Sequence, residues 1–368
     1  ENKARVIAFY LPQYHPIPEN DKYWGKGFTE WTNVAKAKPL FRGHYQPHIP
    51  ADLGFYDLRL PEVREAQAEL ARDAGIEGFC YYHYWFGNGK MLLQKPFEEV
   101  LRLGKPDFPF CLCWANHDWT TKTWVKGSSM VNNTMIAQQE YLGEQDDIKH
   151  FEYCLRAFKD HRYITIEGKP IFLIYDPLSF PNVKEFMNRW NFLAKKNNLK
   201  GIYFIGVTTG RQSSYKIVTN LGFDGVCHNR RWEAEAKAAG FRFVRRMQSL
   251  LGWHLGISLM KYDYNKVVRN YDTPENKLEN CYPVITPGFD RTPRAGRRAG
   301  IYVNSSPKNF KKHVAEVCKS IQDKDDDHRL VFLSAWNEWG EGNYMEPDLK
   351  WGHGYLEALK SVVKFQIK

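Results

Sequence analysis

Eight short apolar runs, separated by segments of helix length, constrain the fold of this 368-residue chain more than any other feature. Buried strands that alternate with amphipathic stretches are typical of βα units around a parallel sheet. The predicted strands are residues 5–11, 76–82, 108–114, 170–175, 202–207, 223–227, 282–286 and 330–335. The predicted helices are residues 61–74, 95–103, 142–159, 181–198, 212–221, 232–251, 307–323 and 353–366.

Eight such units favour a closed barrel over an open sheet. A doubly wound sheet normally carries a glycine-rich phosphate loop after its first strand, and residues 11–16 read LPQYHP instead. We therefore predict an α/β fold, a (β/α)8 TIM barrel that residues 1–368 form as a single domain. The connections at 12–60, 115–141 and 232–281 are longer than a barrel needs, and we expect these long βα loops to form the substrate cleft.

Polar and aromatic residues follow nearly every predicted strand. Barrel enzymes carry their active sites at the C-terminal ends of the strands. Aromatic rings stack on the C–H faces of sugars, and convergent polar groups bind the hydroxyls, so this mixture predicts a carbohydrate site. The predicted substrate-binding residues are Tyr10, Gln13, Tyr14, His83, Tyr84, Trp85, Trp114, Asn116, His117, Asp118, Trp119, Tyr175, His228, Asp290, Arg291, Trp336, Asn337, Trp339 and Glu346. We expect at least one of Trp85, Trp114 and Trp119 to present a ring face to the cleft.

Glu338 and Glu341 are the predicted catalytic residues. They lie three residues apart in the run NEWGEG, directly after the last predicted strand. Glycoside cleavage needs one carboxylic acid to protonate the leaving oxygen and one carboxylate to act as base or nucleophile, and neighbouring carboxylates push their pKa values apart into those roles. The alternative for either residue is a surface ion pair or a helix cap.

His83, His117 and His228 follow three different strands, so a metal site is an alternative use for them. Their spacing carries no metal signature, and hydrogen bonds to sugar hydroxyls are the simpler interpretation. We therefore expect neither a metal nor an organic cofactor.

The formal charge of +10 leaves open an anionic polymer as the substrate. Basic residues concentrate at 242–246 and 291–298, which we interpret as a solvated basic face. They match no nucleic-acid-binding motif, so no nucleic-acid partner is expected.

No run of eighteen apolar residues occurs, so no membrane-spanning segment is expected. The odd number of cysteines, seven, fits a reducing compartment slightly better than a disulfide framework, which slightly favours the cytoplasm. A periplasmic or exported enzyme, with a leader removed before Glu1, stays open.

The segments IAFYLPQYHPIPEND, WGKGFTEWTNV, GFCYYHYWF, WANHDWT and AWNEWGEG resemble the WbsX-like family of bacterial polysaccharide-locus proteins over nearly the whole chain. That family is often labelled glycosyltransferase, yet it is similar to the endo-α-mannosidases of glycoside hydrolase family 99, which are (β/α)8 barrels. The resemblance implies a retaining hydrolase of α-linked glycans. Glu338 would take the proton of the sugar 2-hydroxyl, which attacks the anomeric carbon and forms a 1,2-anhydro sugar, and Glu341 would be the general acid. The sequence departs from the hydrolase motif at Gly340, which replaces a histidine.

Two rival functions belong to other classes. The first is a glycosyltransferase in O-antigen or capsule biosynthesis, although the chain lacks a DxD-type metal motif and a glycine-rich phosphate cradle. The second is a carbohydrate-binding protein without catalysis, against which the intact carboxylate pair argues. Sugar identity, linkage and the choice between endo and exo action stay open at this point.

Overall fold

The computed structural model describes residues 3–120, 134–210, 212–240 and 260–364, together with five positions between 241 and 259. Its centre is a closed barrel of eight parallel strands, because the first barrel strand pairs with both the second and the last. All eight predicted strands are confirmed. They are β1 (Arg5–Tyr10), β2 (Gly78–Trp85), β4 (Phe110–Trp114), β8 (Lys169–Ile174), β9 (Tyr203–Val207), β10 (Gly225–His228), β12 (Cys281–Ile285) and β14 (Leu330–Leu333).

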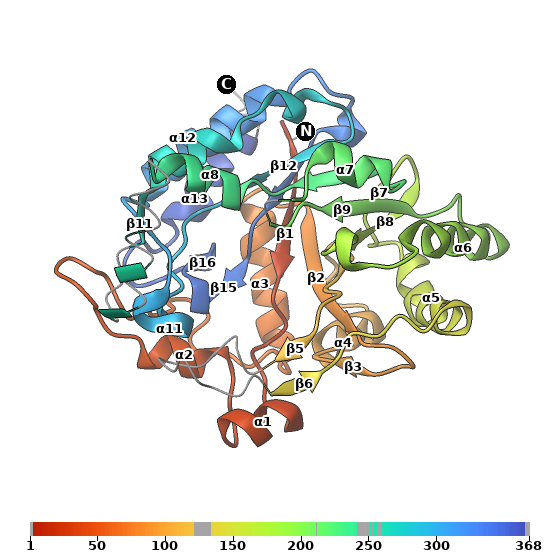
Figure 1. Ribbon diagram of the computed structural model, residues 1–368, viewed down its shortest axis with the longest axis horizontal. Helices are drawn as coiled ribbons and strands as arrows, with labels where there is room; N and C mark the ends of the chain where they lie inside the picture. Colours follow the sequence, from red (N-terminus) through yellow and green to blue (C-terminus); the bar gives the residue numbers. More distant parts are fainter. Residues whose placement is uncertain are drawn as a thin grey trace.

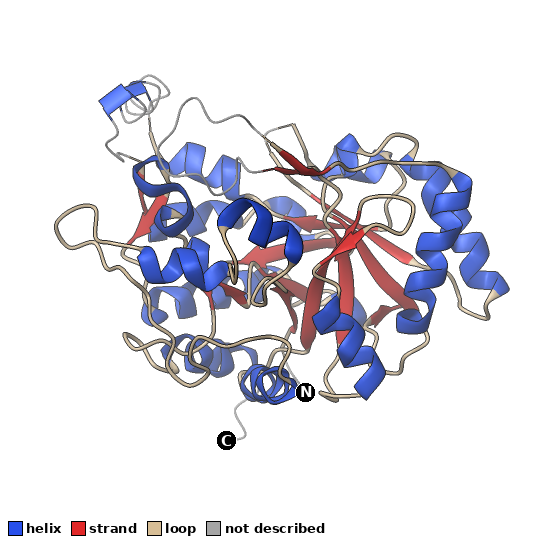
Figure 2. Ribbon diagram, turned by 90° about the horizontal axis from the view of Figure 1, so that it is seen from below, coloured by secondary structure: helices blue, strands red, loops and turns tan. Residues whose placement is uncertain are grey.

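Helices surround the strands, as Figures 1 and 2 show. The helices that follow the barrel strands are α3 (Pro61–Asp73), α4 (Lys95–Leu103), α5 (Glu144–Phe158), α6 (Val183–Lys196), α7 (Tyr215–Asn220), α8 (Arg231–Ala238), α12 (Pro307–Ser320) and α13 (Gly354–Val363). Each begins within three residues of its predicted start. The predicted helix 232–251 ends early, at Ala238, and most of its remainder lies outside the described residues.

The long connections carry small elements of their own. These are α1 (Pro18–Trp24), α2 (Glu30–Lys36), β3 (Met91–Leu92), β5 (Trp119–Thr120), β6 (Met135–Ala137), β7 (Thr165–Ile166), β11 (Lys261–Asp263), α10 (Tyr264–Val268), α11 (Thr292–Ala295), β13 (Ile301–Val303), β15 (Asn337–Glu338) and β16 (Asn343–Tyr344). Short 3-10 turns are η2 (Pro177–Ser179), η3 (Arg269–Tyr271), η4 (Pro274–Lys277), η5 (Gly296–Arg298), η6 (Asp326–His328) and η7 (Trp339–Glu341). In Figure 1, α2, α11 and β15 lie close together on one side of the barrel, which fits the contacts of α2 and α11 with η7.

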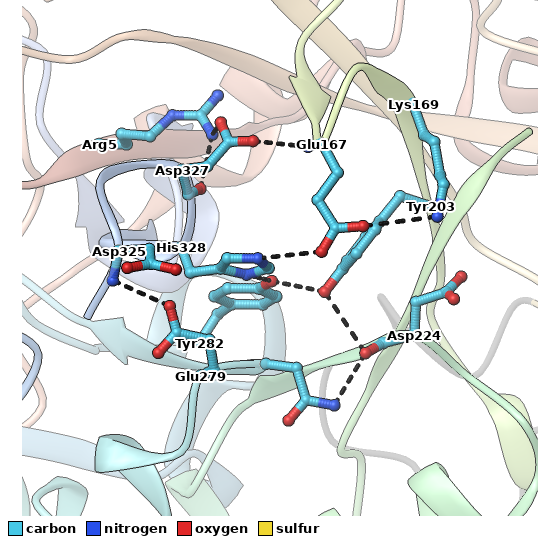
Figure 3. A network of polar contacts seen from close by, with 11 residues as sticks. Arg5, Glu167, Lys169, Tyr203, Asp224, Glu279, Tyr282, Asp325, Asp327 and His328 are labelled. Atoms are coloured by element: carbon cyan, nitrogen blue, oxygen red, sulfur yellow. Dashed lines mark hydrogen bonds and ion pairs between the residues drawn. The ribbon is translucent and has the colours of Figure 1, made fainter. Parts of the chain in front are cut away.

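A polar network closes the N-terminal end of the barrel (Figure 3). The hydroxyls of Tyr203 and Tyr282 lie 2.7 Å apart, and the Tyr282 hydroxyl lies 2.8 Å from Nδ1 of His328. Arg5, the first residue of β1, forms ion pairs with Glu77 at 2.8 Å and Asp327 at 3.1 Å. Residues at this end of a barrel usually serve stability, whereas the active sites of barrel enzymes lie at the other end.

Among the described residues, no helix is both long and apolar enough to cross a membrane.

Candidate active site

A cavity lies at the C-terminal mouth of the barrel. Side chains from β1, β2 and the later strands form its floor, and Glu338 and Glu341 lie in its wall. The lining residues are Phe9, Tyr82, Tyr175, Val207, Cys227, Asn229, Arg231, Tyr271, Val284, Thr286, Phe289, Tyr302, Ser334, Glu338, Glu341 and Asn343. The lining therefore combines polar and aromatic side chains.

The segment that carries both glutamates is a tight antiparallel turn. Asn337 and Glu338 in β15 pair with Tyr344 and Asn343 in β16, and Trp339 stacks on Tyr344 with ring centroids 3.8 Å apart. Such a packed turn fixes the backbone of the carboxylates, which supports a precise catalytic geometry.

Glu346 anchors this turn from beneath. Its carboxylate is buried and accepts hydrogen bonds from Tyr56 at 2.6 Å, Trp339 at 2.8 Å, Gln67 at 2.9 Å and Trp336 at 3.1 Å. Burial raises the pKa of Glu346 to about 7, although the four donors act in the opposite direction. All of these donors come from the protein, so Glu346 supports the site from below the cavity.

Arg294 connects the carboxylates of the site. Its Nη1 lies 2.7 Å from Oε1 of Glu341, its Nε 2.8 Å from Oε1 of Glu30, and its Nη2 3.8 Å from Oε1 of Glu338. Arg291 adds a second cation, with Nε 3.6 Å from Oε1 of Glu341. A buried guanidinium that contacts several carboxyl groups holds them in fixed positions.

The two glutamates have opposite pKa shifts. Burial raises the pKa of Glu338, and the negative charge of Glu341 raises it further. Burial also acts on Glu341, but the cations of Arg294, Arg291 and Arg231 outweigh it and lower the pKa of Glu341. A hydrogen bond joins the two carboxyl groups. These opposite shifts favour a pair that shares one proton at neutral pH, held mainly by Glu338, with the negative charge mainly on Glu341.

Five predicted site residues lie at or beside this cavity. Tyr175, Glu338 and Glu341 line it, and Arg291 pairs with Glu341. Tyr84 lies near Glu338, whose charge adds to burial in raising the tyrosine pKa.

The structure places His83, Trp85 and Trp114 behind the barrel wall. Side chains alternate along a strand, so Tyr82 and Tyr84 face the barrel axis while His83 and Trp85 face outward. Trp85 stacks on His150 of α5 at 4.5 Å, and the Trp114 indole donates to the carbonyl of Trp85 at 3.0 Å. Their rings pack helices against strands.

Six further predicted residues support the chain near the mouth without lining the cavity. The Tyr14 hydroxyl donates to the carbonyl of Asn337 and accepts from the Trp339 amide at 3.2 Å, and the Asn337 amide bonds to the backbone of Leu11. The Tyr10 hydroxyl donates to Gln67 at 2.6 Å. Trp336 and Gln13 are also buried, and Nε2 of Gln13 has no hydrogen-bond partner.

The remaining predicted residues lie outside the cavity lining, on the loop after β4, in β5 or at the end of β10. Asn116 bonds to the backbone of Asp176, and Asp118 accepts from the Gln139 amide at 2.7 Å. Trp119 is buried and stacks on Tyr84 at 5.7 Å, so none of Trp85, Trp114 and Trp119 lines this cavity. His117 is exposed, with its ring 5.8 Å from that of Tyr175, and Nδ1 of His228 lies 3.3 Å from Asn276.

Asp290 holds the loop that carries both arginines. Its carboxylate accepts from His44 at 2.6 Å, from Gln46 at 3.0 Å and from the Thr292 hydroxyl at 2.6 Å. Its contacts define a positioning role for the Arg291–Arg294 segment.

His83, His117 and His228, the alternative metal ligands, do not assemble into one group of potential ligands among the described residues. His83 lies instead beside His150, with their Nε2 atoms 2.7 Å apart, and with Cys154 these form the group of potential metal ligands found among the described residues. A hydrogen bond between two neutral imidazoles accounts for the short contact, because burial lowers the pKa of His83 to about 3.

Sequence reasoning missed Arg294 and Glu30. Arg294 belongs to a basic run interpreted as solvated, yet its side chain is only 6% exposed. Glu30 begins α2 within the first long loop and is fully buried. Because Glu30 is so far from Arg294 in the sequence, nothing in the residues around either one indicates that the two form a buried pair.

The comparisons with known proteins agree with this architecture. The chain belongs to the family described as Glycosyltransferase WbsX, whose model matches residues 6–359. It is 34% identical over 361 residues to two proteins named "Uncharacterized protein WxcX", from Xanthomonas campestris pv. campestris strains B100 and ATCC 33913. The matches cover 98% of this chain but 50% of each relative, so the chain spans about half the length of the curated relatives it matches.

Among solved structures, the chain is similar to a GH99 endo-alpha-mannosidase from Bacteroides thetaiotaomicron, with a TM-score of 0.57, 15% identity and coverage of 97% of this chain and 95% of that one. It is also similar to a structure described as "Glycoside hydrolase-like protein", with a TM-score of 0.61, 16% identity and coverage of 100% and 95%. At these identities the likeness concerns the fold, which is glycoside-hydrolase-like.

Proposed function

We propose that this chain is a retaining glycoside hydrolase that acts on an α-linked glycan or polysaccharide with Glu338 and Glu341. The observation that supports it most is the hydrogen-bonded carboxyl pair at the barrel mouth, which carries one proton and one charge. Glycosidic cleavage requires a carboxylic acid and a carboxylate within one site.

The closeness of the two carboxyls favours the route through the sugar 2-hydroxyl. Direct displacement by a carboxylate uses groups about 5–5.5 Å apart, and inversion uses about 6.5–9.5 Å. In the anhydro route the two groups act on oxygens of adjoining carbons, O1 and O2, so a closely spaced pair fits it.

The proposed reaction forms an anhydro sugar in a first step and opens it with water in a second. Glu338, as carboxylate, accepts the 2-hydroxyl proton, O2 bonds to the anomeric carbon, the glycosidic bond breaks, and Glu341 protonates the leaving oxygen. Glu341 then takes a proton from water, which opens the three-membered ring, and Glu338 returns its proton to O2. In the resting site the proton is on Glu338, so it must cross to Glu341 over their hydrogen bond before cleavage.

A screen of oligosaccharides, with and without nucleotide sugars, tests this function through mass analysis of the products. Release of shorter glycans without a donor supports hydrolysis. Donor-dependent elongation would instead assign the site to a glycosyltransferase, as the family name suggests, and binding without products would assign it to a carbohydrate-binding protein.

A further inference from the structure

A second cavity, of about 230 Å³, adjoins the mouth of the barrel. Phe289 and Tyr302 line both cavities. The turn that carries the glutamates separates them, because Glu341 and Asn343 face the mouth while Gly342 and Tyr344 line the second cavity. A chain of sugars bound at the mouth therefore has a second concave surface within reach.

The acidic groups of this cavity are engaged in holding its walls. Asp290 accepts from His44, Gln46 and Thr292, as described above. Asp348 accepts from the Tyr344 hydroxyl at 2.6 Å and from the Trp351 amide at 2.6 Å. Both side chains are buried, and they accept these hydrogen bonds from the wall of the cavity.

The rim of this second cavity is aromatic and cationic, in contrast to the buried carboxylates of its walls. Tyr45 and Trp351 line the cavity and are 38% and 39% exposed, which is unusual for large aromatic residues. Nζ of Lys350 lies 4.4 Å from the Tyr45 ring centroid and 5.1 Å from that of Trp351. Two partly exposed aromatic side chains thus line the cavity, and the ammonium of Lys350 lies over one face of each ring.

We propose that this second cavity is a subsite for a sugar residue that bears a carboxylate, within the glycan bound at the mouth. The sugar ring would stack on Trp351 or Tyr45, and its carboxylate would pair with the Lys350 ammonium. A neutral sugar would use the rings but gain nothing from the cation. The proposal rests on the proposed function for its placement along a glycan, and the net charge of +10 is compatible with an anionic polymer.

Ligand-detected NMR titration with glucuronic acid and with glucose tests the subsite, since it requires binding and no turnover. The variants are Lys350→Gln and Trp351→Ala. The matched control is Phe192→Ala on α6, where Nζ of Lys196 lies 4.9 Å from the centroid of an exposed ring away from the mouth.

Glucuronic acid should bind more tightly than glucose to the unmodified chain. Lys350→Gln should weaken the binding of glucuronic acid by about threefold to fivefold, the range of a partly exposed ion pair, and should leave the binding of glucose unchanged. Trp351→Ala should weaken the binding of both sugars, and Phe192→Ala should change the binding of neither. Equal binding of the two sugars, or no response to Lys350→Gln and Trp351→Ala, would overturn the proposal. If the glycan screen showed no cleavage, the hydrolase would fail while this binding result stood.

Discussion

Gly340 lies against the carboxylate of Glu30. A Cβ at Gly340 would lie 1.8 Å from Oε1 of Glu30 and 2.9 Å from Nε of Arg294. The position that is a histidine in the family 99 motif must therefore be glycine here, because the Glu30–Arg294 pair fills the space of a side chain. The departure from that motif and the buried ion pair are two parts of one arrangement.

Gly340→Ala should consequently displace Glu30 and Arg294. We expect a loss of about 1–3 kcal/mol in the free energy of unfolding, typical of overpacking, and a fall in glycosidase activity as Glu341 loses its partner. Gly300→Ala is the control, because a Cβ there meets nothing closer than 3.7 Å. Urea denaturation and steady-state rates of both variants measure the effect; equal stability of the two would mean that Glu30 has room to move.

The barrel fold could be predicted from the sequence because the period and the length of the apolar runs are local properties of the chain. It also placed Glu338 and Glu341 at the mouth of the barrel, where both line the cavity, because two carboxylates directly after a strand can be recognised without knowledge of distant residues; their catalytic role stays a prediction. It could not separate the two faces of β2, where Tyr84 approaches Glu338 but His83 and Trp85 pack against α5. The position of a residue at the end of a strand does not determine whether its side chain points into the barrel or outward, because adjacent side chains point to opposite sides.

Arg294 escaped prediction for a different reason. A run of arginines usually marks a solvated face, and only the tertiary structure shows which arginine is buried. Its partners, Glu30 and Glu341, lie 264 and 47 residues away along the chain. Such long-range pairing of charges leaves no periodic signal in a single sequence.

Arg294→Met should destabilise the fold strongly, because it leaves the buried carboxylate of Glu30 without its hydrogen-bonded cation and leaves Glu341 with the more distant Arg291. Removing one partner of a buried ion pair costs about 3–5 kcal/mol. Since Arg294 lowers the pKa of Glu341, its contribution is present above the unfolded pKa of that glutamate and is lost as the pH falls. Denaturation at pH 7 and pH 4 should show the larger loss at pH 7. Arg189→Met, which breaks a more exposed pair with Asp147, should cost at most about 1 kcal/mol.

Glu338→Gln should stabilise the protein at alkaline pH. The folded-state pKa of Glu338 lies above its unfolded value, so the protonated form favours folding at low pH, and this advantage is lost as the pH rises from about 4.5 towards 8. A neutral amide avoids the cost of burying the charge. The variant should match the unmodified protein near pH 5 and exceed it by an amount on the order of 1 kcal/mol at pH 8. Glu62→Gln, on the exposed side of α3, serves as the control; a gain that did not change with pH would contradict the raised pKa.

Tyr282→Phe should lower stability without changing activity, because the Tyr282 hydroxyl belongs to the network at the opposite end of the barrel from the glutamates. Loss of a buried hydroxyl that contacts Tyr203 and His328 should cost about 1–3 kcal/mol. Thermal unfolding and the turnover rate at a temperature where the variant is folded measure the two effects. A substantial loss of turnover in the folded variant would show that this network influences the site.

The roles of the two glutamates can be separated by the leaving group. If Glu341 protonates the departing oxygen, Glu341→Gln should slow cleavage of the natural glycan by about 10²–10⁴-fold yet spare an activated aryl glycoside, whose leaving group needs little proton assistance. Glu338→Gln should impair both substrates, because removal of the 2-hydroxyl proton is required whatever group departs. Steady-state rates of both variants on both substrates give the answer. Because the proton is held mainly by Glu338 before the reaction, the two roles could also be reversed. If Glu338→Gln retained activity on the aryl glycoside but Glu341→Gln did not, Glu338 would be the general acid. Equal, small effects in all four combinations would show that the pair is structural, and would leave Asp118 and Asp290 as the next carboxylates to test.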